Sequence, residues 1–160
     1  MRTTLLSGCP VEIVRPSGTP TRGVVIAIDI WGLRALFDDM CTGLSAANNS
    51  AVAAVEPFPL LTDLPQEMDV RMAAANSLHD EDVMANLGEA AEMLGTDKTA
   101  VMGFCMGDMN AMKAASVEKF DNAVAFYGHI RVPAMWKADK IPPLRPTRLK
   151  SCEPSTVIPK

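Results

Sequence analysis

Short apolar runs alternate with amphipathic segments along most of the chain. Residues 23–28 form a continuous run rich in β-branched side chains, which is typical of a strand buried on both faces. Residues 33–47 carry apolar side chains close to the 3.6-residue period of an amphipathic helix. In chain order, the pattern predicts strands at 11–14, 23–28, 51–55, 100–104 and 123–127, and helices at 33–47, 68–75, 80–94 and 108–117. This alternation favours an α/β fold, with a mostly parallel central sheet and flanking helices.

The composition fits one globular domain and excludes several kinds of partner. Of the 160 residues, 48% are hydrophobic and 21% are charged, which allows a substantial core. The net charge of −4 argues against nucleic acid and against an anionic membrane as partners. The apolar runs are too short to span a membrane or to direct export. Because the four cysteines show neither a CxxC pair nor metal-ligand spacing, we expect a cytoplasmic protein with reduced thiols, no metal and no cofactor.

The last stretch of the sequence differs from the rest. Residues 145–160 contain four basic residues, one acidic residue and several prolines, with no hydrophobic period. Such a segment cannot bury enough apolar surface to order itself. We therefore expect an α/β domain over residues 1–144 and a disordered basic tail over residues 145–160. An orderly domain that gives way to such a tail is what a truncated or frame-shifted reading frame would produce.

The candidate chemistry lies at the end of the predicted strand 100–104. Residues 103–107 read Gly-Phe-Cys-Met-Gly, with a cysteine between two glycines where a strand gives way to a helix. A sharp turn of this kind crowds any Cβ at the flanking positions, and glycine has none. The N–H groups of the following helix favour a thiolate. We therefore predict that Cys105 is an exposed nucleophile at this turn, called the elbow below (residues 103–107); a buried, inert cysteine is the alternative.

Three separate segments resemble the dienelactone hydrolase family, a cysteine-dependent branch of the α/β hydrolases. They are Ala-Ile-Asp-Ile-Trp-Gly at 27–32, the elbow at 103–107 and Ala-Phe-Tyr-Gly at 125–128. The resemblance covers most of residues 10–144. It implies a partial α/β-hydrolase fold and an enzyme that opens a lactone or small carboxylic ester through a cysteine acyl-enzyme.

The resemblance also implies roles for individual residues. Cys105 would attack the substrate carbonyl, and the backbone N–H groups of Met106 and Ile30 would form the oxyanion hole. Asp29 stands where the family has a glutamate that contacts the cysteine in the resting enzyme. Since aspartate is one methylene shorter, this contact is expected to be longer or lost, and Asp29 could instead cap the following helix.

Two further residues are expected to line the substrate pocket. Trp31 follows the segment that carries the oxyanion residue, and it lines the pocket or covers the end of the sheet. Family members use arginines to hold the substrate carboxylate, and Arg71 lies in a comparable segment.

The sequence also departs from the family pattern. Asp108 replaces a second glycine after the elbow, and its charge opposes thiolate formation in Cys105. The family's acid and histidine base are absent downstream, since His129 follows the strand 123–127 too closely to be the base. We therefore expect weak activity or none. Without the strands that carry these groups, strand 123–127 would be an exposed edge through which the protein could self-associate.

Two alternatives to this interpretation remain. One is a catalytically inactive remnant or binding module with the same fold. The other is a different cysteine enzyme with a similar turn, such as a deglycase-like protein or a related class I glutamine-amidotransferase-like protein. That enzyme would need a glutamine shortly after the elbow and a downstream His-x-Glu, and the sequence has neither.

Overall fold

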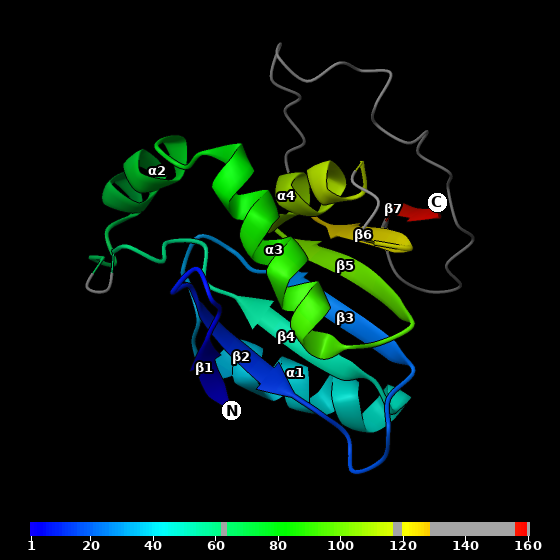
Figure 1. The fold of residues 1–160 in the computed structure, drawn as a ribbon. Helices are drawn as coiled ribbons and strands as arrows, with labels where there is room; N and C mark the ends of the chain where they lie inside the picture. Colours follow the sequence, from blue (N-terminus) through cyan, green and yellow to red (C-terminus); the bar gives the residue numbers. More distant parts are fainter. Residues whose placement is uncertain (62–63, 117–119, 129–155, 160) are drawn as a thin grey trace.

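The computed structural model describes residues 1–61, 64–116, 120–128 and 156–159 (Figure 1). Its elements are β1 (Arg2–Thr4), β2 (Pro10–Val14), β3 (Arg22–Ala27), α1 (Ala35–Asn48), β4 (Ala51–Val55), α2 (Met68–Asn76), α3 (Asp80–Leu94), β5 (Lys98–Phe104), α4 (Met106–Ala114), β6 (Asn122–Phe126) and β7 (Thr156–Pro159). Every strand and helix predicted from the hydrophobic pattern is present, and the α/β fold is confirmed.

One sheet runs through the described residues in the order β1-β2-β4-β3-β5-β6-β7. The four central strands β4, β3, β5 and β6 are parallel, whereas β1, β2 and β7 pair antiparallel at the two sides. All five residues of β4 are buried, as expected for a central strand covered on both faces. Because the parallel strands share one direction, the carboxyl ends of β3, β5 and β6 meet at one edge of the sheet.

Helices cover both faces of the sheet (Figure 1). Helix α1 packs on one face, where its side chains Phe37 and Cys41 join Ile26 of β3 in an apolar cluster. Helices α3 and α4 pack on the other face, where Leu87 and Ala111 join a larger apolar cluster with residues from β2, β3, β4, β5 and β6. The sheet therefore forms the middle layer of a three-layer core.

Helix ends follow the local chemistry of the chain. Gly95 has a positive φ of 63° and ends α3, as predicted from the sequence. Asn49 adopts the left-handed conformation at the end of α1, which asparagine tolerates better than most residues. Helix α4 begins at Met106, two residues earlier than predicted, because the elbow leads directly into its first turn.

Two short strands were missed, and one of them corrects the predicted tail. Residues 156–159 form β7, which pairs antiparallel with β6 from Asn122 to Ala125. The prediction of disorder is therefore wrong for these four residues, while 145–155 and 160 lie outside the described residues. The expectation of an unpaired edge at β6 is also wrong for this stretch, and self-association stays a prediction. Strand β1 has only three residues, too few for a hydrophobic pattern to reveal.

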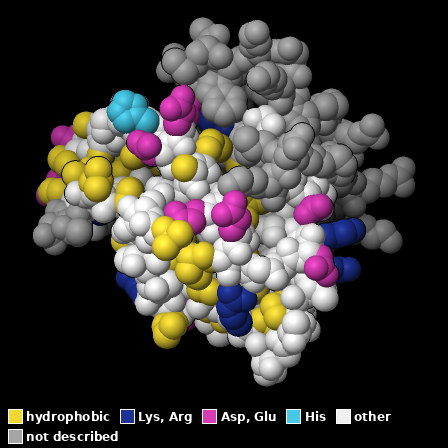
Figure 2. Space-filling model, in the orientation of Figure 1, with side chains coloured by type: hydrophobic (Ala, Val, Ile, Leu, Met, Phe, Trp, Pro, Cys, Tyr) yellow, Lys and Arg dark blue, Asp and Glu magenta, His cyan; other side chains and the backbone are white. Residues whose placement is uncertain are grey.

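The surface carries both signs of charge. Figure 2 shows acidic and basic side chains on the same face of the molecule, with hydrophobic groups between them. In the part of the chain that the structure describes, no helix is both long and apolar enough to cross a membrane.

Candidate active site

Cys105 lies at the turn between β5 and α4, at the carboxyl edge of the sheet. Its backbone has φ 54° and ψ −114°, a conformation that non-glycine residues seldom adopt. The turn is held on both sides, since Cys105 N donates to the Phe126 carbonyl at 3.3 Å and Asp108 N donates to the Cys105 carbonyl at 3.1 Å. The side chain is exposed. The predicted strand-to-helix elbow with an exposed thiol is thus what the structure contains.

Both glycines of the elbow are packed against backbone. A Cβ at Gly107 would overlap the carbonyl of Ala27 at the end of β3, and a Cβ at Gly103 would overlap the peptide between Gly107 and Asp108. All the overlapped atoms belong to the backbone, so no side-chain rotation could relieve these overlaps. The elbow therefore needs glycine at both positions because β3, β5 and α4 approach one another so closely.

Asp108 is buried directly behind the elbow, with an exposed fraction of 1%. Its Oδ1 accepts a hydrogen bond from Phe126 N at 2.8 Å. Burial raises the pKa of this carboxyl from 3.8 to about 6, although the backbone N–H groups of Phe126 and Gly128 favour the charged form. A Cβ at Gly128 would overlap the Asp108 side chain, which therefore packs against the residue just after Tyr127. The hydrogen bond from Phe126 N links the end of β6 to the first turn of α4.

The two predicted oxyanion donors follow two adjoining strands, at the same edge of the sheet. Ile30 follows β3 and Met106 begins α4 just after β5, and β3 and β5 are paired through Ala27 and Gly103. The side chains of Ile30 and Met106 belong to one apolar cluster. Among the described residues, no hydrogen bond uses the Ile30 N–H, and the Met106 N–H belongs to the first helical turn, which has no intrahelical acceptor. Their role as an oxyanion hole stays a prediction.

Asp29 is engaged by Arg34, a residue that the sequence analysis did not single out. Arg34 Nη1 and Nη2 donate to Asp29 Oδ1 and Oδ2, each at 2.7 Å, and Trp31 N donates to Oδ1 at 2.9 Å. This pairing raises the pKa of Arg34. Asp29 does not cap α1, because the helix begins at Ala35 with Arg34 at the N-cap position. The spacing of an acid and an arginine five residues apart, beside a turn, was the available signal.

Trp31 and Arg71 lie together beside one cavity, and their role in substrate binding stays a prediction. Both line a cavity of about 320 Å³ next to the oxyanion segment, and the Arg71 guanidinium lies 5.5 Å from the centre of the Trp31 ring. Arg71 is 5% exposed, and it donates to the carbonyls of Ile30 at 2.8 Å and Leu64 at 2.9 Å. Its guanidinium is thus bound mainly by backbone.

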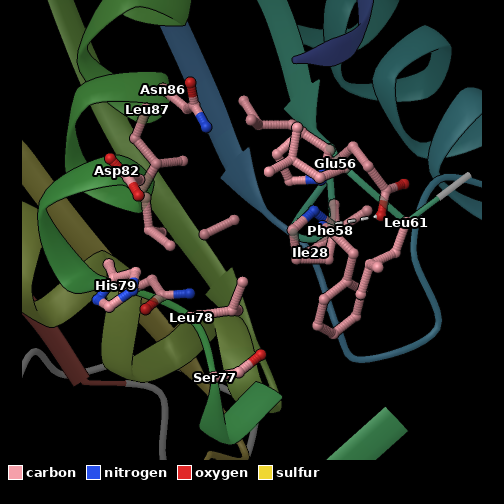
Figure 3. A pocket seen from close by; sticks show the side chains of 17 residues that line it. Ile28, Glu56, Phe58, Leu61, Ser77, Leu78, His79, Asp82, Asn86 and Leu87 are labelled. Carbon is pink, nitrogen blue, oxygen red and sulfur yellow. Dashed lines mark hydrogen bonds between the residues drawn. The ribbon is translucent and has the colours of Figure 1, made fainter. Parts of the chain in front are cut away.

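A second cavity, of about 230 Å³, shares part of its lining with the first, in the chain that follows β4. Figure 3 shows it between α3, with His79, Asp82 and Asn86, and the chain after β4, with Phe58 and Leu61. Most of its lining is apolar. Cys105 is not among the residues that line either of these two cavities, so any substrate group held there must reach toward the sulfur.

Tyr127 is a further residue at this edge that the sequence analysis did not assign. It has a positive φ of 49° and is 78% exposed. Partial desolvation raises the pKa of its phenol, and the negative charges of Asp29, Cys105 and Asp108 raise it further. The resemblance had marked its segment, residues 125–128, as a strand end but had given the tyrosine no role. Within the described part of the chain, no cluster of histidine, cysteine or carboxylate side chains could hold a metal ion.

This fold, with an exposed cysteine at a strained turn after a central parallel strand, is that of a partial α/β hydrolase. The model of the dienelactone hydrolase family matches residues 10–143, and the chain belongs to that family. No curated protein sequence gives a significant match.

Solved structures show the same fold. A Klebsiella pneumoniae protein assigned as a dienelactone hydrolase superposes with a TM-score of 0.73 at 20% identity, over 83% of this chain and 62% of that one. A dienelactone hydrolase-like promiscuous phosphotriesterase from metagenomic libraries gives 0.63 at 19% identity, over 88% and 62%. A cold-adapted esterase from an Arctic intertidal metagenomic library gives 0.54 at 13% identity, over 76% and 54%. The chain thus spans less than two thirds of the length of these structures.

Proposed function

We propose that this chain reacts with lactones or small carboxylic esters through Cys105, forming a thioester acyl-enzyme. The observation that carries the proposal is the exposed Cys105 side chain, held at φ 54° at the sheet edge where Ile30 follows β3 and Met106 begins α4. No hydrogen bond among the described residues uses the Ile30 N–H. A nucleophile and two oxyanion donors at one sheet edge are the parts that acyl transfer requires. Family membership supports the same substrate class.

The proposed reaction begins when the Cys105 sulfur attacks the ester carbonyl carbon and its proton passes to solvent. The carbonyl oxygen gains negative charge, and the N–H groups of Ile30 and Met106 stabilise it by hydrogen bonding. Collapse of this intermediate breaks the bond to the leaving oxygen and leaves a thioester on Cys105. Trp31 and the cavity beside it would hold the acyl or leaving group.

Hydrolysis of the thioester needs a base to activate water, which is typically worth about 10²–10⁴-fold. Of the two histidines, His79 lies at the start of α3 and lines the apolar cavity, while His129 lies outside the described residues. Asp29 is paired with Arg34 and is therefore a weaker candidate for activating Cys105 than the family glutamate. We propose that acylation is faster than deacylation in this chain.

The test is release of 4-nitrophenolate from 4-nitrophenyl acetate by the wild-type protein, Cys105→Ala and Cys41→Ala. We expect a rapid burst followed by slow turnover for the wild type and for Cys41→Ala, because Cys41 is buried in the core. Cys105→Ala should show neither phase above the buffer rate. Equal rates for wild type and Cys105→Ala would contradict the proposal.

The second candidate function is a binding module without catalysis. The pairing of Asp29 with Arg34 favours it, because this pairing removes the expected partner of Cys105. Binding of an unreactive lactone to the wild type, together with no acylation by the activated ester, would support this candidate.

A further inference from the structure

The segment that carries the proposed oxyanion donor Ile30 is fixed by side chains from two other elements. This segment, called the oxyanion loop below, comprises residues 29–33. We propose that Arg71 of α2 and Glu56 after β4 are positioning residues, which hold the oxyanion loop so that the Ile30 N–H faces the developing oxyanion. The proposal rests on the function proposed above and goes beyond the substrate-binding role expected for Arg71.

The peptide between Ile30 and Trp31 is held at both ends. Arg71 Nη1 donates to the Ile30 carbonyl at 2.8 Å, and the Trp31 N–H donates to Asp29 Oδ1 at 2.9 Å. Asp29 is itself fixed by the two hydrogen bonds from Arg34. Rotation of this peptide would therefore break hydrogen bonds on both sides.

The neighbouring peptide, which carries the Ile30 N–H, is held only at its carbonyl end. The Asp29 carbonyl accepts a hydrogen bond from Gly32 N at 3.3 Å. Among the described residues nothing uses the Ile30 N–H on the same peptide. The Ile30 side chain is buried in an apolar cluster, so the residue cannot swing outward without exposing it. The loop thus presents one fixed, unused donor, which is the arrangement that oxyanion stabilisation needs.

Glu56 fixes the other end of the loop. Its Oε2 accepts from Leu33 N at 2.8 Å, and its Oε1 accepts from Phe58 N at 3.1 Å. Its carboxylate lies against Gly32, which has φ +77°, so that a Cβ at this glycine would come within 3.0 Å of both oxygens. One carboxylate therefore joins the oxyanion loop to the chain that follows β4.

The surroundings of Arg71 favour positioning over capture of a substrate carboxylate. Both Nη atoms are used by backbone carbonyls, and the side chain is 5% exposed. Its Nε is buried and has no partner among the described residues, so the fork of N–H groups that would grip a carboxylate is not presented to solvent.

Arg15 provides a matched control on another surface of the molecule. Like Arg71, it donates from Nη1 and Nη2 to two backbone carbonyls, those of Leu94 and Met93 at the end of α3. Arg71→Met and Arg15→Met each remove two hydrogen bonds to backbone carbonyls, but Arg15 is exposed, and only Arg71 touches the oxyanion loop. Arg71→Lys keeps the charge and can reach one carbonyl.

The experiment compares three reactions of Cys105 in each variant. They are acylation by the neutral ester 4-nitrophenyl acetate, acylation by the anionic ester mono-4-nitrophenyl succinate, and alkylation by iodoacetamide. Alkylation displaces iodide from a saturated carbon and develops no oxyanion, so it does not depend on the Ile30 N–H. Each reaction is followed by the rate constant for the first turnover.

We expect Arg71→Met to lower both acylation rate constants about tenfold, since loss of one oxyanion donor costs about 10²–10³-fold and here the donor is loosened, not deleted. Alkylation should stay within about twofold, the range of a small change in local structure. Arg71→Lys should recover part of the loss, Glu56→Gln should lose about threefold because one backbone donor then faces an amide NH₂, and Arg15→Met should change none of the three reactions.

Three results would overturn the proposal. A parallel fall of acylation and alkylation would indicate general destabilisation. A loss confined to the anionic ester would show that Arg71 binds the substrate carboxylate. Acylation unchanged in Arg71→Met would show that the loop does not need this residue.

Hydrogen exchange keeps the inference testable if the wild type is never acylated. Arg71→Met should speed exchange of the amides of Trp31, Gly32 and Leu33, whereas Arg15→Met should not. Faster exchange without any acylation in the wild type would refute the proposed function and leave the fixed loop standing. Unchanged exchange at these amides would refute the positioning role itself.

Discussion

The elbow and helix α1 each contain a glycine and a cysteine, but the surroundings of these residues are opposite in the two regions. In the elbow, Gly107 is enclosed by the backbone of β3, and Cys105 is exposed in a strained conformation. In α1, a Cβ added at Gly43 would have no other atom within 4 Å, and Cys41 is fully buried in regular helix. Residue type alone therefore does not distinguish a reactive site from a structural one.

The difference lies in what each residue must do. In α1, Cys41 packs as a small apolar side chain, and burial raises the pKa of its thiol to about 12. In the elbow, the close approach of β3, β5 and α4 leaves room for no side chain at the glycines and directs the Cys105 side chain outward. Conformational strain is concentrated at the edge where chemistry is proposed, and a rigid sheet and its helices support it.

Gly107→Ala should give the largest effect on stability. The new Cβ would overlap the Ala27 carbonyl, which is backbone and cannot rotate away. We expect a loss of about 3 kcal/mol or more in the free energy of unfolding, or failure to fold. Urea denaturation of the purified variant measures this loss, and a midpoint equal to that of the wild type would show that the elbow is less tightly packed than described.

Asp108 should make stability depend on pH. The pKa of its carboxyl is about 6 in the folded protein, against an ordinary value of 3.8 that we take for the unfolded chain. At pH values between these two, the folded protein therefore binds more protons than the unfolded one. Stability from this group is fully present below about pH 4 and falls as the pH rises through 6, by up to about 3 kcal/mol. In Asp108→Asn this fall should disappear. Urea titrations at several pH values measure it, and identical slopes in the two proteins would contradict the assignment.

Gly43→Ala should have the smallest effect, and of opposite sign. The added methyl group meets open space in the middle of α1 and reduces the freedom of the unfolded chain. We expect a gain of about 1 kcal/mol in the free energy of unfolding. Thermal denaturation measures the gain. A loss of stability would mean that α1 is packed as closely as the elbow and would remove the contrast between the two regions.

Hydrophobic periodicity was sufficient to predict the central elements of the fold. The buried run at 23–28 and the acidic start and Gly95 end of the helix at 80–94 agree with β3 and α3. These signals are local. They agree with the structure because each element buries the apolar side chains that define its own pattern. Strands β1 and β7 were missed because they have only three and four residues and depend on pairing with β2 and β6.

The site was predicted in part, because its contacts are not local. The motif around Cys105 was visible in the sequence, and the family resemblance marked Met106 and Ile30. The pairing of Asp29 with Arg34 and the contact of Arg71 with the Ile30 carbonyl depend on how side chains turn after folding. Glu56 carried no signal at all, since its carboxylate reaches a backbone N–H 23 residues earlier in the chain.

The reactivity of the individual cysteines tests the central claim most directly. The protein is treated with 4-nitrophenyl acetate near neutral pH, quenched in acid and mapped by peptide mass spectrometry. The predicted result is an acetyl group on the peptide containing Cys105, with Cys9 and Cys41 unmodified because burial raises the pKa of both thiols to about 12. An unmodified Cys105, or equal acetylation of Cys9, Cys41 and Cys105, would contradict the claim that the strained turn presents a nucleophile.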